Sequence, residues 1–307
     1  MSANHLRGLI AATHTPFHAD GTLNLAPLES LAEHLDRIGV AGVFIGGTTG
    51  ESLSLSIEER MNLAERWSEI CKWSPLKLIV HVGSNSLADA RTLAHHASTL
   101  HVTAISAVAP CYFKPTKAIA LVEICREIAS AAPLLPFYYY DIPSFTGIQV
   151  PLMSFVEQVC EAVPNFAGIK FSNPDLALYQ NCLHFAEGQL DLPFGIDEYL
   201  LAAVSLGAKA AVGSSYNFSA PIYLALLRAV EAGDWPLARA LQYQGLQIIQ
   251  VLAKYGYLAA SKCVLEHLGI AVGTTRLPLL PLDATQEAEL KADLDQIGFW
   301  ELVTPTS

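Results

Sequence analysis

Short runs of apolar residues alternate along the chain with longer segments of helical period. Within the short runs, of which Leu78-Ile79-Val80 is typical, apolar and polar positions do not alternate. Continuous apolar runs of this length are typical of strands buried on both faces, as in a parallel sheet. We therefore predict eight buried strands, at Gly8–Thr13, Gly42–Gly46, Lys77–Val82, Ala104–Ala109, Pro136–Tyr140, Ala167–Phe171, Pro193–Ile196 and Ala210–Val212.

Amphipathic segments separate the first six strands and predict helices at Ala26–Ile38, Ile57–Lys72, Leu87–Thr99, Thr116–Ala131 and Pro151–Ala162. Strands that each lead into helical sequence predict an α/β fold, a (β/α)8 barrel. A doubly wound open sheet is the alternative, because periodicity does not show whether a sheet closes.

After Asn217 the strand pattern ends. Further helices are predicted at Ala220–Ala232, Trp235–Tyr255, Ala259–His267 and Glu287–Ile297. We expect residues 1–218 to form the barrel and residues 219–307 to form a helical C-terminal extension packed on it, as a single structural unit.

The composition adds limits on partners and location. Of the 307 residues 52% are hydrophobic and only 15% are charged, against about 25% charged in an average soluble domain, so much surface must be buried within the chain or between subunits. The net charge of -11 disfavours nucleic acid and anionic membranes as partners. The chain lacks an apolar stretch of the ~20 residues that a membrane span needs, and its first residues lack the layout of a secretory signal. We expect a cytoplasmic protein.

Cysteine and histidine spacings do not predict a metal site. The six cysteines contain no Cys-x-x-Cys pair, which argues against a zinc knuckle or a thioredoxin-like motif. His14, His18 and His81 lie near predicted strand ends, yet no His-x-His or His-Glu-x-x-His spacing occurs.

Lys170 is the most informative residue for chemistry. It lies late in an apolar strand, and the C-terminal ends of barrel strands are where active sites form. Burial of a lysine favours its neutral amine, which attacks a ketone to form a Schiff base. The alternative is a lysine paired with a barrel carboxylate. Lys209 precedes its strand, at the opposite end, and is predicted to be structural.

Other polar groups also follow strands. Tyr138 and Tyr140 share one face of their strand, where a phenol can move protons or simply complete an aromatic core layer. Gly46-Gly-Thr-Thr-Gly-Glu51 offers backbone N–H groups and hydroxyls to an anion, or forms a tight turn before a helix. Gly195-Ile-Asp-Glu198 offers two carboxylates to a polyol, or to the N-terminus of the next helix. Gly213-Ser-Ser-Tyr-Asn217 offers hydroxyls, or forms a polar turn.

Taken together, the Gly46–Glu51 motif, Tyr140-Asp-Ile-Pro143 and Gly168-Ile-Lys170 resemble the dihydrodipicolinate synthase/N-acetylneuraminate lyase family of class I pyruvate aldolases. The resemblance covers roughly residues 6–282. It implies a (β/α)8 barrel, Schiff-base chemistry without a separate cofactor, and a homotetramer. The synthase branch has an arginine where this chain has Phe145, and the segments around Tyr140, Lys170 and Asp197 are most similar to the branch that cleaves sialic acid.

For that branch the resemblance implies a role for each matching residue. Lys170 forms an imine at C2 of open-chain N-acetylneuraminate, and Tyr140 relays the proton as the C3–C4 bond breaks, giving N-acetylmannosamine and pyruvate reversibly. Thr48 and Thr49 bind the substrate carboxylate. The remaining implied contacts are Ser172, Gly195, Asp197, Glu198 and Ser214 with the substrate, and Tyr112 with a neighbouring subunit's site.

Two other functions stay open at this stage. One is a different pyruvate aldolase, acting on a 2-keto-3-deoxy sugar acid or on 4-hydroxy-2-oxoglutarate, or the synthase itself. The other is a sugar-acid binder without catalysis, against which the presence of both Lys170 and Tyr140 argues.

Overall fold

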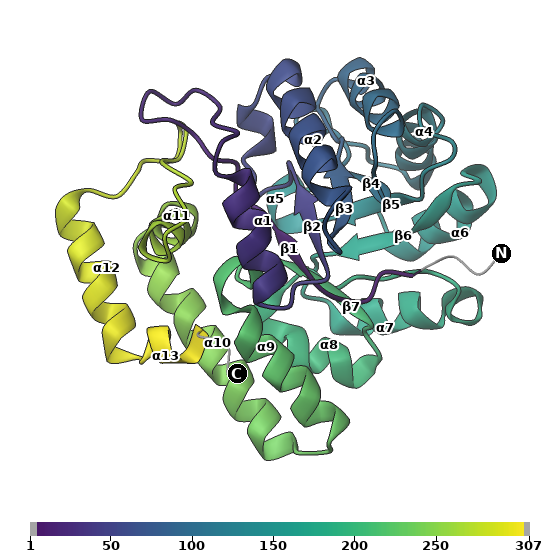
Figure 1. The fold of residues 1–307 in the computed structure, drawn as a ribbon. Helices are drawn as coiled ribbons and strands as arrows, with labels where there is room; N and C mark the ends of the chain where they lie inside the picture. The colour runs from purple at the N-terminus through teal and green to yellow at the C-terminus, as the bar shows by residue number, and fades with distance from the viewer. Residues whose placement is uncertain (1–4, 304–307) are drawn as a thin grey trace.

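The computed structural model describes residues 5–303 and contains one parallel sheet with helices around it (Figure 1). Residues 1–4 and 304–307, which belong to the predicted barrel and extension, lie outside the described residues. The strands pair in the order β6-β5-β4-β3-β2-β1-β7. Their bounds are β1 (Gly8–Ala12), β2 (Gly42–Ile45), β3 (Lys77–His81), β4 (Ala104–Ala107), β5 (Phe137–Asp141), β6 (Phe166–Phe171) and β7 (Ala210–Gly213).

The strand predicted at Pro193–Ile196 is wrong in extent, because only isolated parallel bridges form there. Phe194 bridges Phe171 of β6 and Ala211 of β7, so this segment links the two ends of the strand order. Pro193 has no N–H to donate, and a 3-10 turn, η3 (Asp197–Tyr199), begins soon afterwards. The pairing is therefore too short for a full strand. Parallel strands with covering helices are consistent with a (β/α)8 barrel.

The five helices predicted between the first six strands begin and end close to their predicted bounds, whereas α5, α7 and α8 had not been predicted. The first turn of α2 is fixed by a capping box, in which the Ser56 hydroxyl accepts from the Glu59 N–H and the Glu59 carboxylate accepts from the Ser56 N–H. The helices up to the last strand are α1 (Leu28–Arg37), α2 (Ile57–Cys71), α3 (Leu87–Ser98), α4 (Ala118–Ala129), α5 (Pro143–Thr146), α6 (Leu152–Ala162), α7 (Leu176–His184) and α8 (Leu200–Leu206).

The two faces of the strands bury different groups of side chains. Leu9 and Ala11 of β1 pack with the surrounding helices, whereas Ile10 and Ala12 point to the inner side. In β5 the same alternation places Tyr139 outward and both Tyr138 and Tyr140 inward. Apolar side chains on both faces explain why the strand sequences show no alternation.

After β7 the described chain is helical, with α9 (Tyr216–Glu231), α10 (Trp235–Lys254), α11 (Tyr257–His267), α12 (Ala284–Gln296) and α13 (Phe299–Val303). These helices lie to one side of the strands (Figure 1) and bury a cluster of their own around Phe218, Ile248 and Phe299. Among residues 5–303 no single helix is long and apolar enough to cross a membrane; α10 and α11 meet that test of length and composition only as a pair, bent by 110°.

Candidate active site

A cavity of about 490 Å³ lies at the C-terminal ends of the strands. It gathers side chains from the ends of β1, β5, β6 and β7 and from the loops that follow them. The predicted residues that line it are Thr48, Thr49, Tyr140, Lys170, Ser172, Gly195, Asp197, Glu198 and Ser214. Residues more than 160 positions apart in the sequence thus meet in one space, as the arrangement of a parallel sheet predicts.

Lys170 is buried in this cavity with its amine between two aromatic rings. It is 4% exposed, and its Nζ lies 3.7 Å from the ring centroid of Tyr140 and 4.1 Å from that of Phe44. The parallel register pairs Tyr140 with Lys170, which brings the two side chains to the same level of neighbouring strands. None of the ion pairs among residues 5–303 includes Lys170. The alternative of a lysine paired with a carboxylate therefore has no support from the ion pairs of the described residues.

Tyr140 is held by contacts on several sides. Its hydroxyl lies 3.3 Å from Thr48 Oγ1, which joins the end of β5 to the loop after β2. Phe44 and His81 meet its ring edge-to-face, with centroids 5.7 Å and 6.0 Å away. A primary amine and a fixed phenol side by side are suited to imine formation and to general acid–base catalysis.

His81 supports this arrangement and carries no charge. Its Nδ1 donates to the Gly46 carbonyl at 2.8 Å, and its Nε2 accepts from the Val108 N–H at 3.2 Å. Burial holds the pKa of His81 well below its usual value, and nearby Arg60 and Lys170 lower it further. The sequence alone had placed His81 only near a strand end.

The other two histidines of the sequence analysis lie outside the cavity lining. His14 is buried, its Nε2 is 2.6 Å from Ser261 Oγ, and burial with nearby Lys262 lowers its pKa to about 3. His18 follows in the loop after β1. Within the described part of the chain, no three His, Cys, Asp or Glu side chains are grouped to hold a metal ion.

The carboxylate of Asp197 is buried, and it lies close to Gly213, where there is no room for a side chain. Its Oδ2 accepts from the Ser215 N–H at 2.9 Å and from Ser215 Oγ at 2.5 Å. Burial raises the pKa of Asp197 to about 6, although the Ser215 hydrogen bonds lower it. A Cβ atom at Gly213 would lie 1.8 Å from Asp197 Oδ1, so no larger residue fits there. Glu198 is half-buried beside it and lines the cavity.

Two hydroxyls also face this space. Ser214 Oγ donates to the Tyr257 hydroxyl at 3.0 Å. Ser172 Oγ is buried without a hydrogen-bond partner among the described residues, and a Cβ at Gly195 would lie 2.0 Å from it. Tyr257 was missed in the sequence analysis. It begins a helix of the C-terminal region, where no strand pattern points to the cavity.

Tyr112 is not in this cavity. It is 78% exposed and packs edge-to-face on Phe113, with ring centroids 5.0 Å apart. The side chain of Asn85 holds the segment by accepting from the N–H groups of Cys111 and Tyr112. Within one chain the tyrosine contacts solvent.

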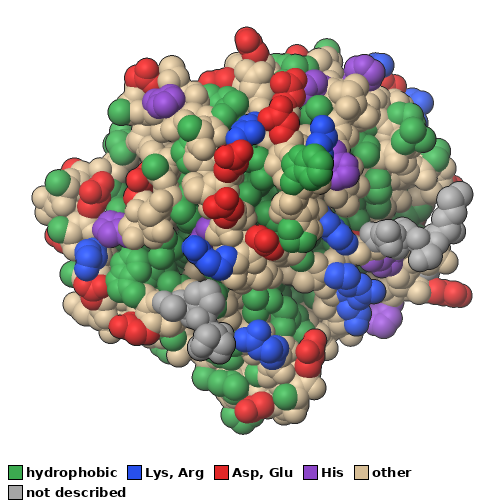
Figure 2. All heavy atoms as spheres, in the orientation of Figure 1, with side chains coloured by type: hydrophobic (Ala, Val, Ile, Leu, Met, Phe, Trp, Pro, Cys, Tyr) green, Lys and Arg blue, Asp and Glu red, His purple; other side chains and the backbone are tan. Residues whose placement is uncertain are grey.

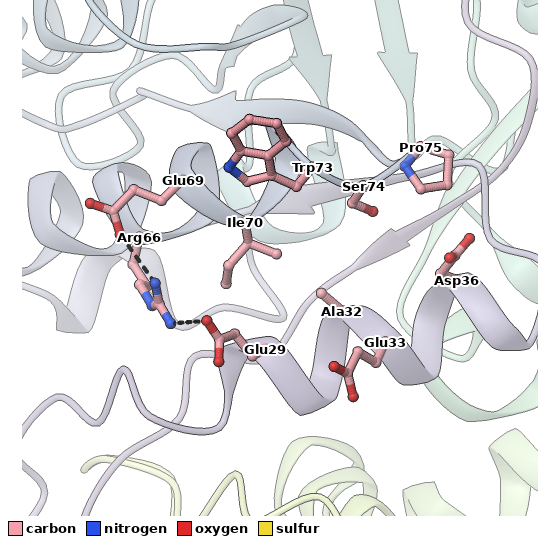
Figure 3. A pocket seen from close by; sticks show the side chains of 10 residues that line it. All are labelled: Glu29, Ala32, Glu33, Asp36, Arg66, Glu69, Ile70, Trp73, Ser74 and Pro75. Carbon is pink, nitrogen blue, oxygen red and sulfur yellow. Dashed lines mark hydrogen bonds and ion pairs between the residues drawn. The ribbon is translucent and has the colours of Figure 1, made fainter.

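A second cavity, of about 430 Å³, lies between α1 and α2 (Figure 3). Its one arginine, Arg66, already pairs with Glu29 at 2.6 Å and with Glu69 at 3.1 Å. Acidic side chains gather over these helices on the face shown in Figure 2. The lining of this second cavity holds no buried nucleophile or base, unlike that of the cavity around Lys170.

The chain is similar to known proteins over nearly its whole length. Residues 5–297 match the dihydrodipicolinate synthetase family. The chain is 42% identical to the solved structure of a Proteus mirabilis N-acetylneuraminate lyase, with a TM-score of 0.93 over 96% of this chain and 100% of that one. The corresponding structure from Aliivibrio salmonicida is 40% identical with a TM-score of 0.93, over 96% of this chain and 98% of that one. N-acetylneuraminate lyase of Gallus gallus is 38% identical, over 95% of this chain and 96% of its own length.

Proposed function

Because this chain belongs to the dihydrodipicolinate synthetase family, we propose that it is a class I aldolase that cleaves N-acetylneuraminate reversibly to N-acetylmannosamine and pyruvate. The observation that carries the proposal is the buried Lys170 amine, free of any carboxylate partner among the described residues and stacked on Tyr140. The relatives named above as N-acetylneuraminate lyases support the choice of substrate.

The proposed reaction starts with attack of Lys170 Nζ on the C2 ketone of the open-chain sugar, with loss of water to form an iminium ion. Tyr140 relays the proton of the C4 hydroxyl to the substrate carboxylate. The C3–C4 electron pair then moves into the iminium, which leaves an enamine on Lys170 and releases N-acetylmannosamine as the aldehyde. Protonation at C3 and hydrolysis of the imine release pyruvate and restore the amine.

Binding roles follow from position in the cavity. Thr48 and Thr49 hold the substrate carboxylate with hydroxyl and backbone donors, on the side of Lys170 where the Tyr140 hydroxyl also lies. Glu198, Asp197 and Ser214 bind hydroxyls of the sugar chain. Gly195 also contacts the sugar chain, and Ser172 is a further substrate contact; both line the cavity. A cavity of about 490 Å³ has room for a nine-carbon sugar acid, whereas a short keto acid would leave much of it empty.

The synthase activity is the second candidate, and one position argues against it. Phe145 lines the cavity and is 71% exposed at its rim, where a cation would be needed to anchor a second carboxylate. Aldolases for shorter keto sugar acids share Lys170 and Tyr140, and only substrate comparison separates them.

We further propose that residues 1–218 and 219–307 form a closed (β/α)8 (TIM) barrel and a helical extension as one unit. The Phe194 bridges between β6 and β7 support closure. A homotetramer is proposed from the low charged fraction and the exposed Tyr112 and Phe113, which would reach a neighbouring subunit. A cytoplasmic location is supported by the six free cysteines.

Borohydride trapping followed by peptide mass mapping tests the function. With N-acetylneuraminate freed of pyruvate, we expect a reduced pyruvate adduct on Lys170. An adduct that forms with added pyruvate but not with N-acetylneuraminate would support a pyruvate aldolase and contradict N-acetylneuraminate as its substrate. If neither compound gives an adduct, the Schiff-base mechanism is wrong.

A further inference from the structure

Glu51, the last residue of the loop after β2, is buried in a way that calls for explanation. Its side chain is 1% exposed, and its backbone has a φ of 54°, in the left-handed region that non-glycine residues rarely adopt. A buried carboxylate in a strained turn persists only where its surroundings hold it. The proposed chemistry gives Glu51 no role.

The groups that hold Glu51 come from the C-terminal region. Lys262 of α11, itself 2% exposed in its side chain, forms an ion pair with Glu51 Oε1 at 2.8 Å. The same ammonium donates to the carbonyls of Thr15 at 2.9 Å and Thr274 at 2.5 Å. The other carboxylate oxygen, Glu51 Oε2, accepts from the Arg276 N–H at 2.9 Å. Both oxygens are therefore occupied by residues that follow the last strand.

Arg276 extends the same contacts along the loop and into α2. Its guanidinium donates to the Ser54 carbonyl at 2.9 Å and pairs with both oxygens of Glu59. From the other side, Thr15 Oγ1 donates to the Gly50 carbonyl at 2.7 Å. The segment from Gly50 to Glu59 is thus tied at several points to residues outside it.

The contacts of Lys262 and Arg276 with Glu51 are linked to the cavity through the backbone. The Glu51 N–H donates to the Thr48 carbonyl at 3.0 Å, so the position of Glu51 fixes the turn that carries Thr48 and Thr49. At the other end of the cavity, α11 supplies Tyr257, which accepts from Ser214. One helix of the C-terminal region therefore contacts both sides of the site.

We infer that Glu51 is a positioning residue, through which Lys262 and Arg276 set the orientation of Thr48 and Thr49 and hence the affinity for the carboxylate of a 2-oxo acid. The inference rests on the proposed function, because it takes Thr48 and Thr49 as the carboxylate site. A purely stabilising ion pair would change the unfolding temperature and leave substrate affinity unchanged.

The test is Glu51→Gln, which keeps the shape and the acceptor for Arg276 but removes the charge that Lys262 requires. We expect the pyruvate concentration for half-maximal borohydride trapping, and KM for N-acetylneuraminate, to rise about tenfold, since small displacements of binding groups are costly. The limiting trapping rate and kcat should stay within about threefold, because Lys170 and Tyr140 keep their contacts. Lys254→Met is the matched control, since it removes the exposed Lys254–Asp293 pair of the same region and should leave both values unchanged.

Glu59→Gln is a second variant in case Glu51→Gln fails to fold. Glu59 is about one-quarter exposed, and glutamine preserves its cap of α2. Glu59→Gln weakens the contact between Glu59 and Arg276 and leaves the Glu51–Lys262 ion pair in place. We therefore expect the pyruvate concentration for half-maximal trapping to rise about twofold. An unchanged half-saturation in every folded variant, or a loss confined to the limiting rate, would overturn the inference. Absence of a pyruvate adduct in the unaltered protein would instead overturn the proposed function.

Discussion

Two buried lysines of this chain lie in opposite kinds of surroundings. Lys262 is paired with a carboxylate at 2.8 Å and donates to two carbonyls, whereas the amine of Lys170 lies against the faces of Tyr140 and Phe44. Both are almost inaccessible to solvent. Burial alone therefore does not distinguish a structural lysine from a nucleophile. What distinguishes them is what surrounds the amine: oxygen atoms bind that of Lys262, whereas that of Lys170 lies against aromatic rings at the cavity.

Removal of the nucleophile gives the largest expected effect. Lys170→Met should lower kcat by about 10⁴-fold or more, because among the described residues Lys170 is the one lysine that lines the cavity. The pyruvate adduct should disappear from the mass map. Since Lys170 forms no ion pair among the described residues, the unfolding temperature should not fall. Cleavage at more than a few per cent of the normal rate would show that Lys170 is not the nucleophile.

The same substitution at the paired lysine should have the reverse outcome. Lys262→Met leaves Glu51 buried without its counter-charge, which costs about 3–5 kcal/mol of unfolding free energy. Urea unfolding measures this loss. Pyruvate trapping on Lys170 should still occur in the folded protein at saturating pyruvate. A stability loss below about 1 kcal/mol would mean that water already solvates the pair.

Tyr140 contributes a phenol as well as an aromatic face beside Lys170. Tyr140→Phe keeps the face and removes the hydroxyl, so pyruvate should still be trapped while kcat for cleavage falls about 10²–10³-fold. Steady-state cleavage and trapping on the same sample separate the two effects. Equal losses in both would mean that the hydroxyl acts mainly in imine formation.

Asp197 tests whether the carboxylate near Lys170 serves the sugar. Because burial raises the pKa of Asp197 to about 6, it is ionised above that pH and takes up a proton below it. KM for N-acetylneuraminate should therefore rise as pH falls from 7 to 5. Asp197→Asn should raise KM at pH 7 about tenfold and flatten that pH dependence, with little effect on cleavage of a short keto acid. Equal damage to both substrates would contradict a role in sugar recognition.

The smallest effect is expected at Lys209, an exposed lysine just before β7. Among the described residues, the Lys209 side chain forms no hydrogen bond or ion pair. Lys209→Met should therefore change the unfolding free energy of the protein by less than about 0.5 kcal/mol. Activity should stay unchanged. A marked loss would show that charge at this end of the sheet reaches the site.

Much of the fold was predictable because buried parallel strands leave a clear trace in the sequence. The predicted strand at Lys77–Val82 and the observed one at Lys77–His81 nearly coincide, and Lys170 and Tyr140 line one cavity because both come late in neighbouring strands. The segment at Pro193–Ile196 was predicted as a full strand from its apolar pattern, although Pro193, which lacks an N–H, already argued in the sequence against full strand pairing.

The contacts of the C-terminal region could not be predicted in the same way. Lys262 and Tyr257 lie in a helix whose amphipathic pattern tells which face is buried, but not against which partner. Glu51 and Arg276 are separated by 225 residues, and no periodicity links them. Such pairs can be identified only from the folded structure, in which the loop after β2 lies close to the last helices.

That separation has a consequence for the order in which the protein matures on the ribosome. The seven strands of the described residues and Lys170 are synthesised before Lys262 and Arg276, since the last of these strands ends at Gly213. Until the final helices leave the exit tunnel, the Glu51 carboxylate lacks the contacts of Lys262 and Arg276, while the hydrogen bond from Thr15 to Gly50 can already form. The nascent chain can therefore build its sheet early and still lack a substrate-ready loop, which forms only when synthesis is nearly complete.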